Sequence, residues 1–125
     1  MEKAIKTEGT EDTPKIVLDK EGNKFEISGR SLPENASKFY APIQVWVEGY
    51  IKDPNPETEV IINFDYFNSS SIIQIFEILL KFQQIKKTGK EVKIIWIYDK
   101  NDELMEAEGL EIKSVLDLPF ELRSN

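Results

Sequence analysis

The chain has 125 residues with neither cysteine nor histidine, and its 23 acidic against 16 basic residues give a formal net charge of −7 at pH 7. Without cysteine it forms no disulfide and has no thiolate chemistry or cysteine-bound zinc. Without histidine it lacks the commonest general base and metal ligand. The acidic balance argues against nucleic acid and against an anionic membrane surface as partners.

The length is that of one domain, and 40% hydrophobic residues suffice for a real core. No stretch approaches the roughly 18 consecutive apolar residues of a membrane-spanning helix. The N-terminus, MEKAIKTEGTEDTPK, lacks the apolar core of a secretion signal. We therefore expect a cytoplasmic protein, and we expect no metal or other cofactor.

The first half of the chain predicts a hairpin followed by a helix. Residues 1–13 are polar without apolar periodicity, so we predict a flexible tail there and one domain over residues 14–125. Residues 15–19 (KIVLD) and 24–28 (KFEIS) are typical of strands, and the KEGN between them is typical of a hairpin turn.

The first helix is predicted after this hairpin. Ser31 is a candidate N-cap, with Pro33 and Glu34 in the first turn. Apolar residues then recur at spacings of three and four as far as Tyr50 and indicate one buried face. Pro42 lies inside this pattern, which predicts a kink or a new helical start.

The second half predicts two further helices between strands. Residues 59–64 (EVIINF) indicate a buried strand. A wide apolar helical face follows from Ile72 to Phe82, and Gly89 is suited to end that helix. Residues 91–98 (EVKIIWIY) are almost continuously apolar, which is typical of a central strand covered on both faces.

A weaker third helix is expected within residues 99–116 and a short last strand over 118–122. The segment from Val60 to Tyr98 forms a β–α–β crossover, which we expect to be right-handed. The pattern predicts an α/β domain with a mixed sheet of four to five strands and about three helices.

Asn68, Ser69, Ser70 and Ser71 stand where the buried strand gives way to the second helix. One reading is structural, because Asn and Ser are favoured N-caps worth about 1 kcal/mol each. The other is reversible phosphorylation, since the positive end of a helix tolerates an anion. Four such residues are more than a cap requires. Asp65 would repel a phosphoryl group here, which favours the release of a partner over the creation of a dock.

The same junction resembles the STAS domains of anti-sigma-factor antagonists, where a phosphorylatable Ser or Thr heads a helix. More specifically, TPKIVLD, EISGRSLPENASKFYAPIQVW, INFDYFNSSS and KTGKEVKIIWIY are similar to the SiaC family of bacterial regulatory phosphoproteins. The resemblance runs from Thr13 to about Phe120. Two residues depart from the family pattern: Ser69 stands where threonine is common, and Leu32 stands where an aromatic residue is usual, which can alter a contact near the site.

The resemblance implies a partner-switching protein rather than an enzyme. A cognate Ser/Thr kinase would phosphorylate Ser69, and a PP2C-type phosphatase would reverse the modification. The unphosphorylated form would bind and activate a diguanylate cyclase, which links the switch to cyclic-di-GMP and to biofilm or aggregation control. The residues expected to flank the site and contact partners are Tyr66, Asn68, Ser70, Ser71, Ser31, Glu34 and Asn35.

Two other functions stay open at this stage. Asp65, Asp99 and Asp102 follow or end predicted strands, and such carboxylates favour Mg²⁺ in a small phosphatase or a receiver-like domain. They are equally typical of turns and helix caps. A constitutive interaction module, in which the serines only cap the helix, is the other alternative.

Overall fold

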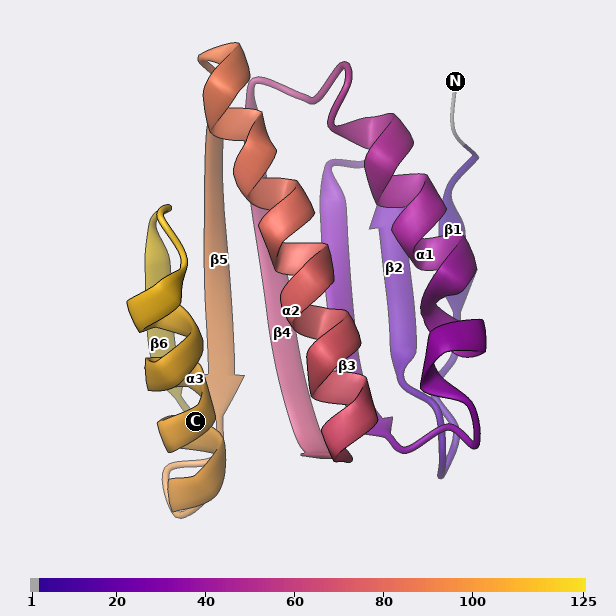
Figure 1. Ribbon diagram of the computed structural model, residues 1–125, viewed down its shortest axis with the longest axis vertical. Coiled ribbons are helices and arrows are strands. Elements are labelled where there is room, and N and C mark those ends of the chain that lie inside the picture. The colour runs from indigo at the N-terminus through magenta and orange to yellow at the C-terminus, as the bar shows by residue number, and fades with distance from the viewer. Residues whose placement is uncertain (1–2) are drawn as a thin grey trace.

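A mixed sheet of six strands, ordered in space as in the chain, forms the framework of the protein (Figure 1). The computed structural model describes residues 3–125. The strands are β1 (Ile5–Thr7), β2 (Lys15–Asp19), β3 (Lys24–Ser31), β4 (Glu57–Phe67), β5 (Glu91–Tyr98) and β6 (Phe120–Ser124). The helices are α1 (Ala36–Tyr50), α2 (Ser69–Gln83), the 3-10 turn η1 (Gln84–Thr88) and α3 (Glu103–Val115). The predicted α/β class is confirmed, with six strands in place of four to five.

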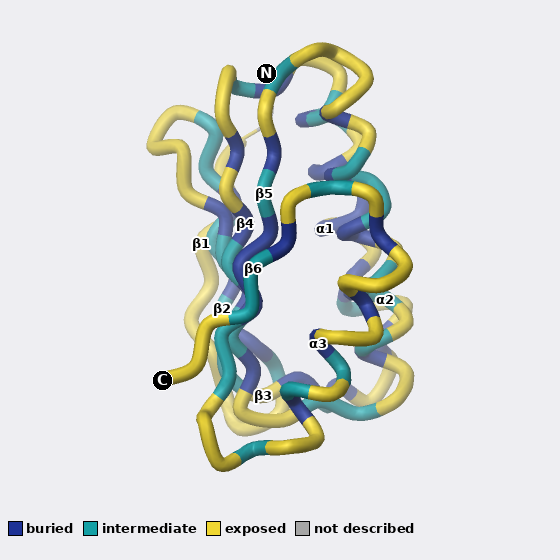
Figure 2. Tube along the Cα trace, turned by 90° about the vertical axis from the view of Figure 1, so that its left-hand side faces the viewer, coloured by how far each residue is buried: buried dark blue, intermediate teal, exposed yellow. Residues whose placement is uncertain are grey.

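The helices cover only one face of the sheet (Figure 2). Strands β1, β2 and β3 pair antiparallel, whereas β3 to β6 pair in parallel through the helical crossovers. Each crossover leads to the next strand in the same direction, and crossovers of one hand then place every helix on the same side. The core therefore lies between this helical layer and one face of the sheet.

Among residues 3–125, no helix covers the opposite face of the sheet, which corrects the prediction that β5 is covered on both faces. One row of paired residues crosses it from β1 to β6: Lys6, Val17, Glu26, Ile61, Ile95 and Glu121. Ile95 is nevertheless only 1% exposed. Its strand neighbours Ile61 and Glu121 flank it, and ion pairs of Glu121 with Lys93 and Arg123, each at 2.8 Å, extend over this face. Side chains from the sheet itself thus bury the apolar residue.

Strand β1 was not foreseen. Ile5, Lys6 and Thr7 pair with Leu18, Val17 and Ile16 of β2, so the prediction of a flexible tail over residues 1–13 is wrong for this segment. Three residues are too few to show a strand period in sequence. The tail prediction also included Met1 and Glu2, which lie outside the described residues.

Helix α1 begins later than predicted. Its N-cap is Asn35, whose side chain accepts a hydrogen bond from the Lys38 amide at 3.0 Å. Ser31, the predicted cap, is the last residue of β3 and pairs with Phe67 of β4. Pro42 lies inside one continuous helix with its ring exposed, and no second start occurs there. Glycine ends the second helical segment as predicted, because Gly89 adopts the left-handed conformation (φ 83°) after η1.

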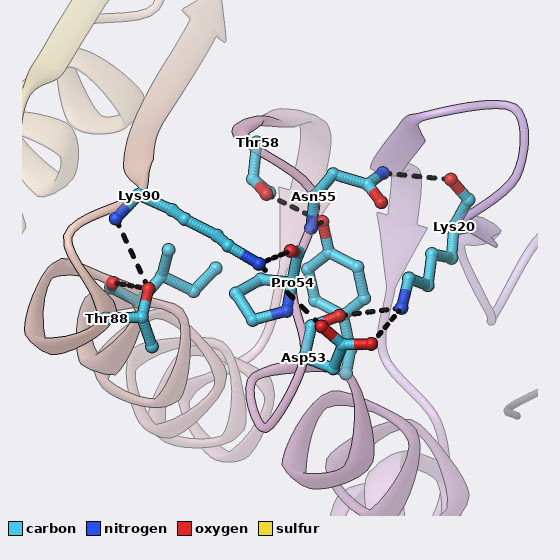
Figure 3. A network of polar contacts seen from close by, with 9 residues as sticks. Lys20, Asp53, Pro54, Asn55, Thr58, Thr88 and Lys90 are labelled. Carbon is cyan, nitrogen blue, oxygen red and sulfur yellow. Dashed lines mark hydrogen bonds and ion pairs between the residues drawn. The ribbon is translucent and has the colours of Figure 1, made fainter.

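Polar contacts hold the connection from α1 to β4 at the end of the sheet where β4 and β5 begin (Figure 3). The Lys20 ammonium donates to the Asp53 carbonyl at 2.7 Å, and the Lys90 ammonium donates to the Pro54 carbonyl at 2.6 Å. The Tyr50 hydroxyl accepts from the Asn55 amide at 3.1 Å and lies 2.7 Å from the Thr58 hydroxyl. The two prolines of DPNP prevent the helix from continuing into this turn, and these hydrogen bonds supply partners for the backbone groups of the turn.

The ion pairs on the open face predict an unusually acidic Glu121. Hydrogen bonds from Lys93 and Arg123 lower the pKa of Glu121 from its usual 4.5 to about 2. Because the folded-state pKa is depressed, this contribution to stability is complete above pH 4.5 and is lost as the pH falls through about 2. A ¹³C-carboxyl NMR titration should show this pKa, and Lys93→Met should raise it towards 4.5.

Lys24→Met is the matched control, since Lys24 lies on the same face but outside the ion pairs found among residues 3–125. It should leave the Glu121 titration unchanged. A Glu121 carboxyl that titrates near 4.5 in the unmodified protein would contradict the assignment.

Candidate functional site

Helix α2 starts with a side-chain cap from Asn68. The Asn68 backbone is extended (φ −93°, ψ 171°), and its side-chain oxygen accepts from the Ser71 amide at 2.9 Å. The first amides of a helix have no intrahelical acceptor, so the amides of Ser69 and Ser70 remain at the positive end of the helix. The cap predicted for this junction is therefore present, and the asparagine supplies it.

The three serines that follow have different environments. Ser69 and Ser70 are exposed in the first turn of α2, whereas Ser71 is fully buried, with 0% of its surface accessible. A kinase can reach a hydroxyl only where it is accessible. Ser69 and Ser70 meet this condition, whereas the Ser71 side chain is part of the protein interior.

A buried chain of hydroxyl groups anchors this end of α2. The Ser71 hydroxyl donates to the Ser31 carbonyl at 3.0 Å, and the Ser31 hydroxyl donates to the Ser71 hydroxyl at 2.9 Å. The Tyr40 hydroxyl lies 2.5 Å from the Ser31 hydroxyl. Since the Ser31 proton is already used, Tyr40 is the donor in that last bond. The chain of donors thus runs from α1 through the end of β3 to α2.

A further feature supports this direction of donation, and a second backbone contact strengthens the anchor. Burial raises the pKa of Tyr40 to about 12, against a smaller opposing effect of its bond to Ser31, so Tyr40 stays protonated at neutral pH. The Ser31 carbonyl also accepts from the Asn68 amide at 3.0 Å, which gives that oxygen two donors. The start of α2 is consequently tied to the C-terminal end of β3 at two points.

Of the predicted flanking residues, Ser31, Asn68 and Ser71 meet in this network. Ser31 was predicted as a helix cap, but its role in the structure is the buried hydrogen bonding with Ser71. Asn35 is occupied as the cap of α1, and Glu34 is exposed just before it. Their predicted contact with partners stays a prediction.

Tyr66 lies at the end of β4 and is 49% exposed. The Arg30 guanidinium lies 5.5 Å from the centre of its ring, an arrangement suited to a cation–π interaction. Sequence reasoning missed Arg30, because parallel pairing of β3 with β4 places it opposite Tyr66 across a gap of 36 positions. The register of two parallel strands was the only signal that could have found it.

The three carboxylates of the Mg²⁺ alternative, Asp65, Asp99 and Asp102, line one cavity of about 620 Å³, and the last two accept hydrogen bonds from nearby backbone amides. Asp102 caps α3 by accepting from the Met105 amide at 3.1 Å, and Asp99 accepts from the Asn101 amide at 2.8 Å. Within residues 3–125, no group of three or more His, Cys, Asp or Glu side chains is arranged to hold a metal ion. The turn and cap interpretation therefore accounts for Asp99 and Asp102.

Comparison with known proteins decides the family. The SiaC model, described as "SiaC family regulatory phosphoprotein", matches residues 7–125. The chain belongs to the SiaC family. It is therefore a member of a family of regulatory proteins, as the resemblance at PEN and YFNSSS indicated.

Relatives from Pseudomonas aeruginosa share both sequence and fold with this chain. An uncharacterized protein of strain UCBPP-PA14 is 27% identical over 117 residues, which cover 94% of this chain and 93% of that protein. SiaC of P. aeruginosa matches with a TM-score of 0.87 at 25% identity, over 99% of this chain and 100% of that one.

A further match comes from the crystal structure of the diguanylate cyclase SiaD in complex with its activator SiaC, also from P. aeruginosa. It has a TM-score of 0.88 at 27% identity and covers 99% of this chain and 100% of that one. In that species a SiaC protein thus forms a complex with a diguanylate cyclase. Among residues 3–125 of the present SiaC-family chain, no helix is both long and apolar enough to cross a membrane.

The buried network predicts that Ser71 matters for stability and Ser70 does not. Ser71→Ala removes the acceptor of the Ser31 hydroxyl and should lower the free energy of unfolding by about 1–3 kcal/mol in urea denaturation. Ser70→Ala, one residue earlier and exposed, should change it by less than about 0.5 kcal/mol. Equal effects of the two substitutions would contradict the structural role of Ser71.

Proposed function

We propose that the protein is a phosphorylation-controlled partner switch with Ser69 as its phosphoacceptor. The observation that carries this proposal is the separation of roles at the start of α2. Asn68 supplies the cap and Ser71 supplies the anchor, which leaves the exposed Ser69 hydroxyl without a structural task in these bonds. The SiaC family pattern supports Ser69 over Ser70, because its phosphorylated residue is the first hydroxyl after the asparagine.

The surroundings of Ser69 support a switch that releases a partner. A phosphoryl group adds about −1.5 to −2 charges at neutral pH. The helix start tolerates this charge in water, but burying it against a partner without a cation to pair with is costly. Asp65 is exposed at the end of β4, and the whole chain is acidic, so the local field opposes a further anion. The unmodified form is therefore the binding form.

The proposed partners are those that the SiaC family resemblance implies. We propose a Ser/Thr kinase and a PP2C-type phosphatase that act on Ser69, and a diguanylate cyclase as the protein that the unmodified form binds and activates. The complex of SiaD with its activator SiaC supports the last of these. The protein itself would work in the cytoplasm without catalysis of its own, as a control element for cyclic-di-GMP and for biofilm formation or aggregation.

Phosphate mapping tests the acceptor. Incubation with ATP and a Ser/Thr kinase encoded beside this gene should add one phosphate, and mass spectrometry of the digested protein should place it on Ser69. Ser69→Ala should abolish the modification, while Ser70→Ala, which removes the other exposed serine and keeps Ser69, should retain it. Phosphate on Ser70, or an unmodified chain with an active kinase, would reject the assignment.

Partner binding tests the switch. Calorimetry with the proposed partner, a diguanylate cyclase from the same organism, should show binding of Ser69→Ala close to that of the unmodified protein. Ser69→Asp, which places a carboxylate at the helix start, should bind at least about tenfold more weakly, a loss of about 1.4 kcal/mol. Equal affinity of the two variants would favour the constitutive module, in which the serines serve only the helix.

A further inference from the structure

The exposed large apolar side chains are concentrated on one side of the helical layer. Apart from Val45 on α1, those found among residues 3–125 lie at the end of β4, on α2 or on α3. They are Tyr66 (49% exposed), Ile73 (59%), Leu104 (83%), Leu110 (52%) and Val115 (61%). Single exposed apolar residues need no explanation, but a cluster of them marks an interaction surface.

Four of these five residues, all but Leu110, line one of two cavities along α3. One cavity of about 460 Å³ has walls from α2, including Ile73 and Phe76, and from α3, including Val115. A second cavity of about 340 Å³ lies between the end of β4, including Tyr66, and the first part of α3, including Leu104. Glu108 and Glu111 line both cavities, so the two cavities are neighbours along α3, and together they are called the groove below.

Helix α2 supplies more apolar surface than the core uses. Ile75, Ile78, Leu79 and Phe82 are fully buried and cover the sheet. Ile72, Phe76 and Leu80 are only half-buried and Ile73 is exposed, and these four line the groove. Because residues three and four apart share a helix face, Ser69 heads the stripe that continues through Ile72, Phe76 and Leu80. Ser69 therefore lies about one helical turn before Ile72, on the face of α2 that borders the groove.

The rim of the groove is acidic. Glu77, Glu108 and Glu111 line its larger part, and Asp65 and Asp102 join Glu108 and Glu111 around the smaller part. Neither set of lining residues includes a lysine or an arginine. None of these five carboxylates takes part in the ion pairs found among residues 3–125. The surface thus joins an apolar floor to unpaired negative charge.

We propose that this groove binds an amphipathic helix of a partner protein, with apolar residues on one face and Lys or Arg along its edges. Apolar anchors at helical spacing would fill the floor, and the basic edges would pair with the glutamates. A second copy of this chain is a poor occupant, because two acidic rims would face each other. The proposal deepens the proposed function by naming the element of the partner that is bound, but groove binding does not itself require phosphate on Ser69.

The probe is a synthetic helical peptide of leucine and lysine. It has about 14 residues and is roughly 20 Å long, close to the length of α3. Its leucines follow the spacing i, i+3, i+4, i+7. Titration into the ¹⁵N-labelled full chain should shift amide signals of α2 and α3 that line the groove. A peptide of the same composition with scrambled leucines, and one with glutamate in place of lysine, should each bind at least about tenfold more weakly.

Val115 and Val45 provide a matched pair, because they are 61% and 62% exposed but lie on α3 and α1. Ile73→Ser combined with Val115→Ser should weaken peptide binding at least about tenfold, and Val45→Ser should leave it unchanged. Glu108→Lys with Glu111→Lys should reverse the preference between the lysine and glutamate peptides. Circular dichroism confirms that each variant is folded.

Three outcomes would overturn the proposal: equal effects of Val45→Ser and the groove variant, equal binding of the scrambled peptide, or amide shifts confined to other surfaces. Sedimentation that shows a dimer, lost on Val115→Ser, would assign the groove to a second copy instead. Ser69→Asp and Ser69→Ala are measured with the same peptide. If the groove variants weaken peptide binding while the two Ser69 variants bind the peptide alike, the groove stands and the phosphorylation switch does not act through it; loss of the Ser69 effect on cyclase binding would reject the switch separately.

Discussion

The hydrogen-bond chain from Tyr40 through Ser31 to Ser71 determines where α2 begins. It joins the first helix, the end of β3 and the start of the second helix in the interior. The Ser31 and Ser71 hydroxyls each donate one hydrogen bond and accept another, and burial keeps the Tyr40 hydroxyl protonated as a donor. A buried network that is fully satisfied specifies one arrangement, whereas a partly satisfied one is costly. Among the described residues, no buried side-chain nitrogen or oxygen lacks a hydrogen-bond partner. The position of Ser69 at the start of α2 is consequently fixed by this buried network.

The one-sided sheet concentrates the exposed features of interest on a single layer. Helices α2 and α3 lie on the same side of the sheet (Figures 1 and 2). The start of α2, the groove and the exposed apolar residues of α3 therefore all belong to that side. Helix α3 can approach the sheet closely because Gly109 has no Cβ, and one added there would lie 2.5 Å from the Trp96 ring. The Trp96 indole also donates to the Met105 carbonyl at 3.0 Å. Close packing of α3 onto β5, with α2 packed against α1, leaves the space between α2 and α3 open.

Sequence reasoning recovered the features that depend on local period and missed those that depend on pairing. The hairpin, the three helices, the parallel strands and the glycine at the end of η1 follow from spacing and turn chemistry. Strand β1 is too short to show a period, and Ser31 has the composition of a cap while serving a buried bond to a residue 40 positions away. The apolar run of β5 suggested helical cover on both faces, because sequence does not reveal that Ile95 is buried on the open face beside the ion-paired Glu121.

At the candidate site the limits were similar. The asparagine and serines marked a helix start, and the burial of Ser71 against the exposure of Ser69 needed the structure. The choice of Ser69 as phosphoacceptor came from the family resemblance and not from periodicity. Neither Arg30 beside Tyr66 nor the width of the groove could be predicted, because both depend on the distance between elements that are separated in the chain.

The agreement between strand order in the sheet and strand order in the chain has a consequence for how the protein is made. Each strand pairs only with its predecessor and its successor, so no strand must be inserted between two others that are already joined. Such a topology keeps loop closure short for a largely parallel sheet, and short closure favours rapid folding. The hairpin of β2 and β3 can form first as the chain leaves the ribosome, and each helix–strand unit can then add to the growing edge. The chain is thus suited to folding during its own synthesis, from the N-terminal side to the last strand.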